Sequence, residues 1–250
     1  MAAHPLVVEF LGISGSGKST LARSLAARFE RQGYRAKLVT MQRPTVSGRL
    51  IGILSKSANL CRFALCYWDE FGDARSILKL FPQKSTLAST RLLSYLTYIV
   101  AIRLRTTIDF QAVIFDQGIA QAVYSLSLFS SQNRDGAYAE ALNILPAPHI
   151  LIILDVPTHT ASKRLVQRRG LAKVARITDY DKKIMEASTD AIKEIGSRLA
   201  ASGCRVIHYR PRRSATVEES TDDLFRTLWP TVWRAGSRGG CLYTQSEARA

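Results

Sequence analysis

The stretch Gly12-Ile13-Ser14-Gly15-Ser16-Gly17-Lys18-Ser19-Thr20 decides the fold, and it directly follows the apolar run 6–11. It matches the pattern G-x-x-x-x-G-K-[ST] at every fixed position, and it stands between an expected buried strand and an expected helix, as this motif requires. Glycines let backbone N–H groups curl around an anion that bulkier side chains would obstruct. The helix that opens near Ser19 directs its positive dipole end to the same point. The pattern therefore predicts a phosphate-binding loop.

The residues of this loop indicate a nucleoside triphosphate as the ligand. Lys18 has the length to reach the β- and γ-phosphates, and the Ser19 hydroxyl is a suitable Mg²⁺ ligand. A glycine-rich turn without a ligand would not explain why Lys-Ser-Thr follows the last glycine. We expect the cradle to comprise Gly12, Ile13, Ser14, Gly15, Ser16, Gly17, Lys18, Ser19 and Thr20.

Length and composition indicate a globular protein. The chain has 250 residues, 46% hydrophobic and 22% charged, which is long enough for a substantial core and unlike a disordered chain. Its four cysteines, with no Cys-x-x-Cys pair, predict reduced thiols used for packing. The longest apolar stretch, between Arg91 and Arg103, is shorter than the roughly 20 residues of a membrane span. We expect a cytoplasmic protein with no signal peptide and no membrane segment.

The net charge of +15 has two interpretations. Lysine and arginine clusters neutralise nucleic-acid phosphates, but they also serve a site for a small, highly anionic substrate. Residues 156–213 carry 14 Lys and Arg against 5 Asp and Glu, and this concentration favours a specific anion-facing segment. No zinc-finger, RNP-type or basic-zipper pattern accompanies the charge, so nucleic acid is the less favoured partner.

Five apolar, β-branched-rich runs alternate with helical patterns along the chain. Runs that are nearly continuous in apolar residues are typical of strands buried on both faces, and the helices between them are the crossovers that parallel strands need. The sequence thus predicts a three-layer α/β/α fold with a five-stranded parallel sheet. The expected strands are Val7–Leu11, Ala36–Met41, Ala112–Asp116, Ile150–Val156 and Arg205–Tyr209.

We expect one phosphate-loop domain over residues 1–233. Residues 45–90 form a long excursion before the third strand, and residues 234–250, without apolar periodicity, form a tail that we expect to be disordered. The last helix is expected from Val217 to about Leu228, ending before Pro230.

The third expected strand ends in a carboxylate, Asp116. An acid at the carboxyl end of a strand beside the phosphate loop can hold Mg²⁺ or accept the proton of the acceptor group. The structural alternative is a side chain that only caps the next helix, and one carboxylate can do both.

A basic helix follows the fourth expected strand. Arg164 and Arg168 are four residues apart and so share one helical face. The segment from 164 to about 180, with Arg176, has the size and charge of a lid that closes over phosphates. The alternative is a solvated basic face. With the phosphate loop and Asp116, these residues predict a small phosphotransferase in which Lys18, Asp116 and Arg168 act on the transferring group.

At this point the chain resembles the thymidylate kinase-like branch of the P-loop nucleoside and nucleotide kinases. Phe10-Leu-Gly-Ile-Ser-Gly-Ser-Gly-Lys-Ser-Thr is similar to that family's Phe-Glu-Gly-x-Asp-Gly-x-Gly-Lys-Ser-Thr. Leu154-Asp-Val-Pro, Ala161-x-x-Arg164 and Arg168-Arg169-Gly170 match its Leu-Asp-Val, Ala-x-x-Arg and Arg-Gly segments. The resemblance implies ATP as donor, Mg²⁺, and Arg164 and Arg176 on the donor side. Family members often dimerise, which makes a homodimer a candidate assembly.

The acceptor side departs from that family. Gln42 and Gln117 stand where the family has the arginines of Arg-Glu-Pro and Asp-Arg-Tyr, which hold the acceptor monophosphate. A charged contact to phosphate contributes about 1.5–3 kcal/mol, so the loss of two such contacts changes what can bind. The resemblance places Gln121 in the stretch that meets the nucleobase. The acceptor therefore stays open among a nucleotide, a nucleoside and another hydroxyl compound.

Two other functions remain open. One is a regulatory module that binds ATP and turns it over slowly, for which Gln42 and Gln117 are weak support. The other is a nucleic-acid end kinase, which only the charge supports. Tyr95, Tyr98 and Tyr124 have helical spacing, which favours core packing over stacking on a base.

Overall fold

The computed structural model describes most of the chain. The residues described are 5–40, 68–83, 86–105, 110–130, 136–144, 146–169, 182–212 and 214–237. Three parts of the chain lie outside these residues: much of the predicted excursion at 45–90, the predicted lid from 170 to about 180, and residues 238–250.

The sheet has five parallel strands in the order β2-β3-β1-β4-β5, which places the strand before the phosphate loop at the centre. The strands are β1 (Leu6–Leu11), β2 (Ala36–Val39), β3 (Ala112–Phe115), β4 (Ile150–Leu154) and β5 (Arg205–Tyr209). All five predicted strands are confirmed, though the second, third and fourth end earlier than expected. β4 ends at Leu154 because the backbone turns there, with the Val156 N–H donating to the Leu154 carbonyl at 3.1 Å.

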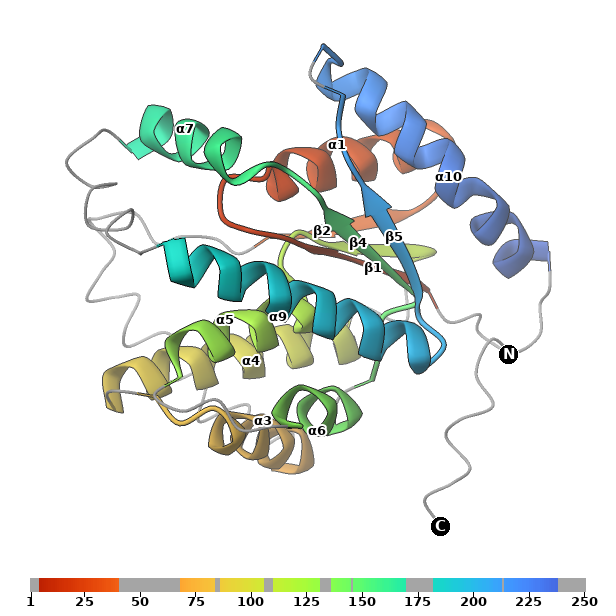
Figure 1. The fold of residues 1–250 in the computed structure, drawn as a ribbon. Coiled ribbons are helices and arrows are strands. Elements are labelled where there is room, and N and C mark those ends of the chain that lie inside the picture. Colours follow the sequence, from red (N-terminus) through yellow and green to blue (C-terminus); the bar gives the residue numbers. More distant parts are fainter. Residues whose placement is uncertain are drawn as a thin grey trace, which may run out of the picture.

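Helices cover both faces of the sheet and make the predicted three layers (Figure 1). On one face lie α1 (Lys18–Arg31) and α10 (Val217–Ser237); on the other lie α4 (Thr86–Arg105), α5 (Ile119–Phe129) and α9 (Lys182–Ala201). Outside this second layer α3 (Trp68–Leu80) packs on α4, and α6 (Ala137–Ile144) packs on α3 and α9. The short helix α7 (Thr158–Arg169) follows β4 at the carboxyl edge of the sheet.

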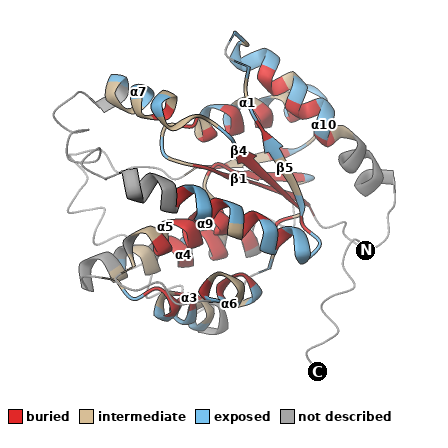
Figure 2. Cartoon of the chain, in the orientation of Figure 1, coloured by how far each residue is buried: buried red, intermediate tan, exposed pale blue. Residues whose placement is uncertain are grey.

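The alternation of side chains along β1 divides the core into two halves. Leu6, Val8 and Phe10 belong to the cluster under α1 and α10, whereas Val7 and Leu11 belong to the cluster under α4, α5 and α9. Strand β1 is buried throughout, as Figure 2 shows for the central strands. Two-sided burial is the reason why its sequence is nearly continuous in apolar residues.

The last helix begins as the sequence indicates but ends later. Thr216 and Glu219 form a capping box: the Thr216 N–H donates to Glu219 Oε2 at 2.8 Å, and the Glu219 N–H donates to Thr216 Oγ1 at 3.1 Å. The predicted end before Pro230 is wrong, because α10 continues to Ser237 and so includes the first residues of the predicted tail. The proline at position 230 removes one backbone hydrogen bond of the helix. The burial of Leu224 and Leu228 against α1 stabilises α10 in spite of this loss.

Candidate functional site

The predicted phosphate loop lies between β1 and α1, at the carboxyl edge of the sheet. Gly15 (φ +86°) and Gly17 (φ +98°) have left-handed backbone conformations, and Gly17 caps the N-terminus of α1. A Cβ at Gly15 would collide with the Ala161 carbonyl and lie 2.9 Å from Leu165 Cγ. Both glycines are therefore required by backbone conformation, and Gly15 also by the close approach of α7.

Lys18 is folded back over this loop. Its Nζ donates to the carbonyls of Gly12 at 2.6 Å and Ile13 at 2.9 Å, and the residue is only 8% exposed. Burial lowers the pKa of Lys18 to about 8, against the raising effect of the neighbouring Asp116 carboxylate. The structure thus places Lys18 and Asp116, both predicted to be catalytic, close enough for their charges to influence each other, although they do not form an ion pair.

Asp116 follows β3 directly and is 3% exposed. Its N–H donates to the Val39 carbonyl at 3.1 Å, which fixes the end of β3 to the neighbouring strand. The side chain is accordingly held at the carboxyl edge of the sheet, next to the loop that carries Lys18 and Ser19. This is the position that the sequence predicts.

Helix α7 rests on the phosphate loop. Arg164 Nη1 donates to the Ser16 carbonyl at 3.4 Å, and the same nitrogen lies beside Gly17. Arg164 is exposed, so its guanidinium borders the loop from the solvent side. Arg168 stands in the last turn of α7, but its side chain, like Arg176, lies outside the described residues.

One buried hydroxyl in the loop has no partner. Ser16 is 1% exposed, and its Oγ makes no hydrogen bond within the described part of the chain. Leaving a buried hydroxyl unbonded is unfavourable. Such a group is typical of a loop that completes its hydrogen bonds with a ligand.

Two buried polar groups lie below this loop, and the sequence analysis missed the contacts of both. Gln121, which the resemblance places in the stretch that meets the nucleobase, accepts a hydrogen bond from the Gly12 N–H through its Oε1 at 3.3 Å. Glu9 is fully buried and accepts from the Ala120 N–H at the start of α5, at 3.0 Å. The available signal was the charge of Glu9 itself, which interrupts the otherwise apolar Leu6–Leu11.

The described part of the acceptor side is formed by α4 and the start of α5. The Tyr95 hydroxyl donates to the Gln117 carbonyl at 3.4 Å, and burial with the carboxylates of Asp116 and Glu9 raises the pKa of the Tyr95 phenol. Tyr95 and Tyr124 are buried, as the core interpretation predicts, whereas Tyr98 is 47% exposed. Gln42 lies outside the described residues.

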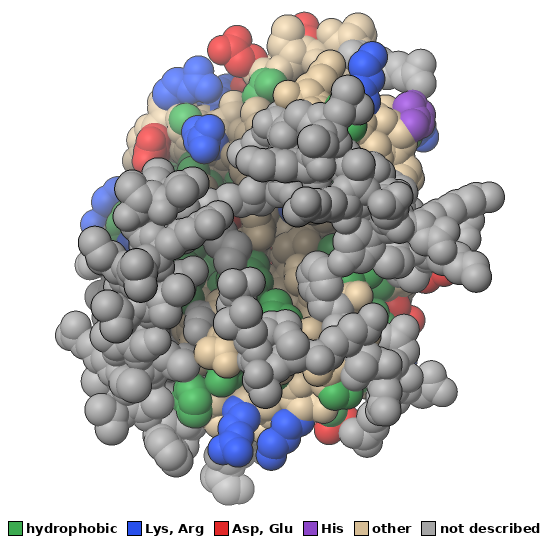
Figure 3. Space-filling view, turned by 90° about the vertical axis from the view of Figure 1, so that its left-hand side faces the viewer, with side chains coloured by type: hydrophobic (Ala, Val, Ile, Leu, Met, Phe, Trp, Pro, Cys, Tyr) green, Lys and Arg blue, Asp and Glu red, His purple; other side chains and the backbone are tan. Residues whose placement is uncertain are grey.

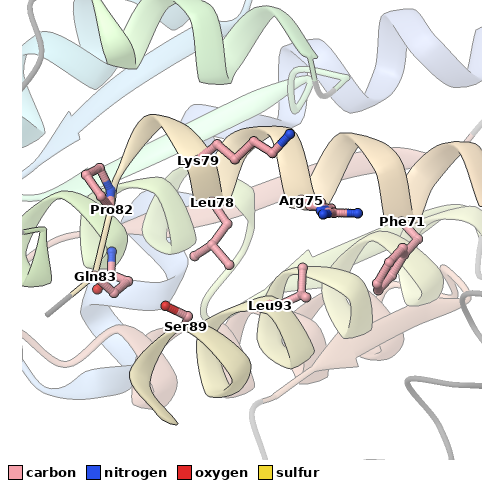
Figure 4. A pocket seen from close by; sticks show the side chains of 8 residues that line it. All are labelled: Phe71, Arg75, Leu78, Lys79, Pro82, Gln83, Ser89 and Leu93. Carbon is pink, nitrogen blue, oxygen red and sulfur yellow. The ribbon is translucent and has the colours of Figure 1, made fainter. Parts of the chain in front are cut away.

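Figure 3 looks onto the end of the molecule where α7 lies. A separate groove of about 620 Å³ lies between α3 and α4 (Figure 4). Arg75, Leu78 and Lys79 line it from α3, Ser89 and Leu93 line it from α4, and no phosphate-loop residue reaches it. This groove is therefore distinct from the predicted triphosphate site.

A protein-family comparison identifies the chain. The family model described as "AAA domain" matches residues 7–195, which include the phosphate loop, Asp116 and Arg164. The chain belongs to this AAA domain family. No curated protein matches the sequence significantly.

Solved structures with the same fold include a deoxyadenosine kinase and a thymidylate kinase. Deoxyadenosine kinase from M. mycoides, solved with dCMP and dCDP, is 15% identical with a TM-score of 0.51 over 90% of this chain and 100% of that chain. Thymidylate kinase from Candida albicans is 16% identical with a TM-score of 0.52 over 92% of this chain and 94% of that one. The predicted P-loop kinase fold is confirmed.

Two expectations about the whole chain can be compared with the described residues. No helix among them has the length and apolar character needed to cross a membrane. Cys204 is a buried free thiol, and burial raises its pKa to about 12, as expected for a packing residue. The cytoplasmic location and the homodimer stay predictions.

Proposed function

We propose that this chain is an ATP-dependent phosphotransferase that transfers the γ-phosphate of Mg·ATP to a small acceptor. The observation that carries the proposal is the placement of Lys18 Nζ on the Gly12 and Ile13 carbonyls, inside a loop bordered by Asp116 and Arg164. The Lys18 amine lies against backbone carbonyls of the glycine-rich loop, and among the described residues no carboxylate is within ion-pair distance of it. An anionic ligand would give it a partner.

The donor phosphates would be held by the loop and by α7. Backbone N–H groups at the start of α1, the Lys18 ammonium and the unbonded Ser16 hydroxyl supply donors. Arg164 stands at the rim, and we assign Arg168 and Arg176 to the same role as the lid closes. Guanidinium groups would stabilise the charge that spreads over the transferring phosphoryl group.

The residues fit a magnesium ion. Ser19 and Asp116 would hold it with a hydroxyl and a carboxylate, oxygen donors of the kind that Mg²⁺ prefers, while phosphates and water complete its coordination. When bound, Mg²⁺ neutralises charge on the β- and γ-phosphates. Asp116 would also accept the proton that the acceptor hydroxyl loses.

An uncharged acceptor fits the described residues better than a monophosphate. Around Asp116 they provide its own carboxylate and the buried Tyr95 phenol, whose hydroxyl donates to the Gln117 carbonyl at 3.4 Å, and neither group is cationic. The Arg103 guanidinium is committed to the Pro146 and Ala147 carbonyls and to Glu9. We therefore favour a nucleoside or another hydroxyl compound over a nucleotide.

The test is ADP release from Mg·ATP over a panel of nucleosides, nucleoside monophosphates and sugars, with Lys18→Ala as the blank. We expect stimulation by an uncharged acceptor that is absent in Lys18→Ala. Slow turnover that no acceptor stimulates, with tight Mg·ATP binding, would favour a regulatory module instead.

A DNA or RNA end in the panel tests the nucleic-acid alternative. Stimulation by such ends alone, with salt-dependent retention on DNA, would replace the small-acceptor proposal by an end kinase. Equal ADP release from the wild type and Lys18→Ala would refute the proposal as a whole.

A further inference from the structure

Glu9 is a fully buried carboxylate in the central strand, two residues before the apolar strand ends. It points to the face covered by α4 and α5, since its contacts are with the start of α5 and with Arg103 of α4. It has no access to a substrate, so it cannot be a catalytic residue.

The contacts of Glu9 are concentrated on the first turn of α5. Its Oε2 accepts from the Ala120 N–H at 3.0 Å, and the Ile119 N–H is a second backbone donor. A carboxylate at this point satisfies N–H groups that a helix start leaves without partners. Arg103 Nη1 lies 3.6 Å from Oε1 and balances part of the charge.

Gly118, the residue before α5, leaves the space that this carboxylate occupies. A Cβ there would lie 2.5 Å from Glu9 Cγ and closer still to the carboxyl group. The backbone of Gly118 (φ −95°, ψ −157°) is extended and has a negative φ, so it does not have the left-handed conformation that favours glycine. The Glu9 side chain is thus the feature that excludes a side chain at position 118.

Glu9 is an unfavourable choice for core packing. Burial raises the pKa of its carboxyl, against the lowering effects of Arg103 and of the Ala120 and Ile119 N–H groups. Its Oε1 makes no hydrogen bond in the described part of the chain. An apolar side chain would suit the strand better, because a buried ion pair is often no more stable than well-packed hydrophobic residues.

The turn that Glu9 holds carries Asp116. The chain passes from Asp116 through Gln117 and Gly118 into α5, and Gln121 of the same helix bonds to Gly12 of the phosphate loop. Two buried hydrogen bonds therefore join the start of α5 to β1 and to the loop. We propose that Glu9 is a positioning residue, which fixes the turn 116–118 and so keeps Asp116 in place relative to Lys18. This inference rests on the proposed function, in which Asp116 holds Mg²⁺.

The first test compares nucleotide affinity with and without Mg²⁺, by calorimetry on the full chain. Glu9→Gln keeps the shape of the side chain but loses its charge. We expect it to keep the metal-free ATP affinity within about twofold and to lower the gain that Mg²⁺ adds by about tenfold, the scale for groups that orient a metal ligand. Equal gains in Glu9→Gln and wild type would overturn the inference.

The second test asks whether Glu9 and Gly118 act through one contact. Gly118→Ala should weaken the Mg²⁺-dependent affinity in the wild type and add less than about twofold in a Glu9→Ala background, where the space is vacant. Gly72→Ala, at a helical glycine with nothing within 4 Å, is the matched control and should change nothing. Independent, multiplicative effects of Gly118→Ala and Glu9→Ala would overturn the coupling.

Thermal unfolding of each variant checks that it is folded at the assay temperature. If wild type and Lys18→Ala bind ATP equally, the proposed function fails and the inference fails with it. If the wild type binds Mg·ATP through Lys18 but Glu9→Gln matches it, the inference alone fails.

Discussion

The two faces of the sheet are built differently, although β1 contributes alternate residues to both. Towards α1 and α10, β1 presents Leu6, Val8 and Phe10; towards α4 and α5 it presents Glu9 between Val7 and Leu11. Both faces have an apolar core, but the first carries a cluster of aromatic rings between α1 and α10, and the second adds buried charged and amide groups to its apolar residues. These groups include Glu9, Arg103, Asp116 and Gln121.

Because of this difference, we expect substitutions on the first face to change mainly the stability of the fold and substitutions of the polar groups on the second face to change mainly ligand binding. The Phe225 ring packs edge-on against Phe29 and tilted against Trp229, with centroid distances of 5.1 and 5.2 Å, and such rings bury large apolar areas. Buried polar groups on the other face contribute less to stability, because the cost of their desolvation offsets much of what their hydrogen bonds contribute. The predictions below compare the apolar face with the polar one.

The largest effect on stability is expected for Phe29→Ala on the apolar face. Phe29 is fully buried, with ring centroids 5.1 Å from Phe225 and 6.1 Å from Tyr34. Its truncation should lower the free energy of unfolding by about 3–5 kcal/mol, measured by urea denaturation. Mg·ATP affinity, measured well below the unfolding temperature, should stay within about twofold. A large loss of affinity in the folded variant would contradict the separation of the two faces.

On the polar face, Gln121→Leu should mainly change ligand binding. The substitution leaves the buried Gly12 N–H without its acceptor. An unsatisfied buried donor costs about 1–3 kcal/mol, and here it destabilises the conformation of the phosphate loop. We expect ATP affinity to fall about tenfold, by calorimetry. Thr221→Val on α10 removes a buried hydroxyl that bonds only within its own helix and is the matched control. Equal affinity in both variants would show that Gln121 does not support the loop.

The sequence predicted the fold because its central strands β1, β3 and β4 are buried on both faces. Strands such as Ile150–Leu154 and Leu6–Leu11 are apolar at almost every position, which is typical of parallel strands covered by helices on both faces. The edge strand Arg205–Tyr209 is buried only at Tyr209, so its sequence is less apolar. The end of α10 was not predictable by the same reasoning. Local preference ends a helix before Pro230, and the packing of α10 on α1 is a tertiary contribution that periodicity does not reveal.

The positions of candidate site residues could be predicted where a short sequence segment marks them. Lys18 and Asp116 are marked by their local contexts, a loop motif and a strand end. The roles of Gln121 and Glu9 depend on contacts across 109 and 111 residues of sequence, and no local pattern encodes those distances. Such long-range polar contacts are what the structure adds.

The pH dependence of nucleotide binding tests the state of Lys18. Burial lowers the pKa of the free amine to about 8, while bound phosphates favour the ammonium form and raise it. Below about pH 8 the amine is already charged, so its titration does not change affinity. Above it, ATP binding must take up a proton, and the affinity should fall by at most tenfold, or about 1.4 kcal/mol, per pH unit.

Calorimetry at pH 9 in two buffers of different ionisation enthalpy measures this uptake. Lys18→Ala, which has no amine, is the control and should show none at this pH. Proton release, or uptake that persists in Lys18→Ala, would contradict the assignment. In the ligand-free protein, the pKa of Lys18 is about 8 when the chain is folded and 10.5 when it is unfolded. The contribution of Lys18 to the free energy of unfolding should therefore rise with pH between about 8 and 10.5.

The smallest effect is expected for an ion pair at the rim of the apolar face. Arg28 Nε lies 2.7 Å from Asp222 Oδ1 across α1 and α10, with the two side chains 27% and 46% exposed. Exposed pairs of this kind contribute about 0–1 kcal/mol, and salt screens them. Asp222→Asn should therefore lower the free energy of unfolding by less than about 1 kcal/mol at low salt and by less still in 1 M NaCl.

Arg28→Ala is the informative partner variant for this pair. The Arg28 guanidinium also lies 5.0 Å from the centroid of the Phe225 ring, so its removal loses packing as well as charge. We expect Arg28→Ala to destabilise the protein more than Asp222→Asn does, with a difference that 1 M NaCl does not abolish. If the two variants were equally destabilised and equally sensitive to salt, the face towards α1 and α10 would depend on charge at its rim. Stability there would then not come from apolar packing alone, and the contrast with the polar face would be weaker.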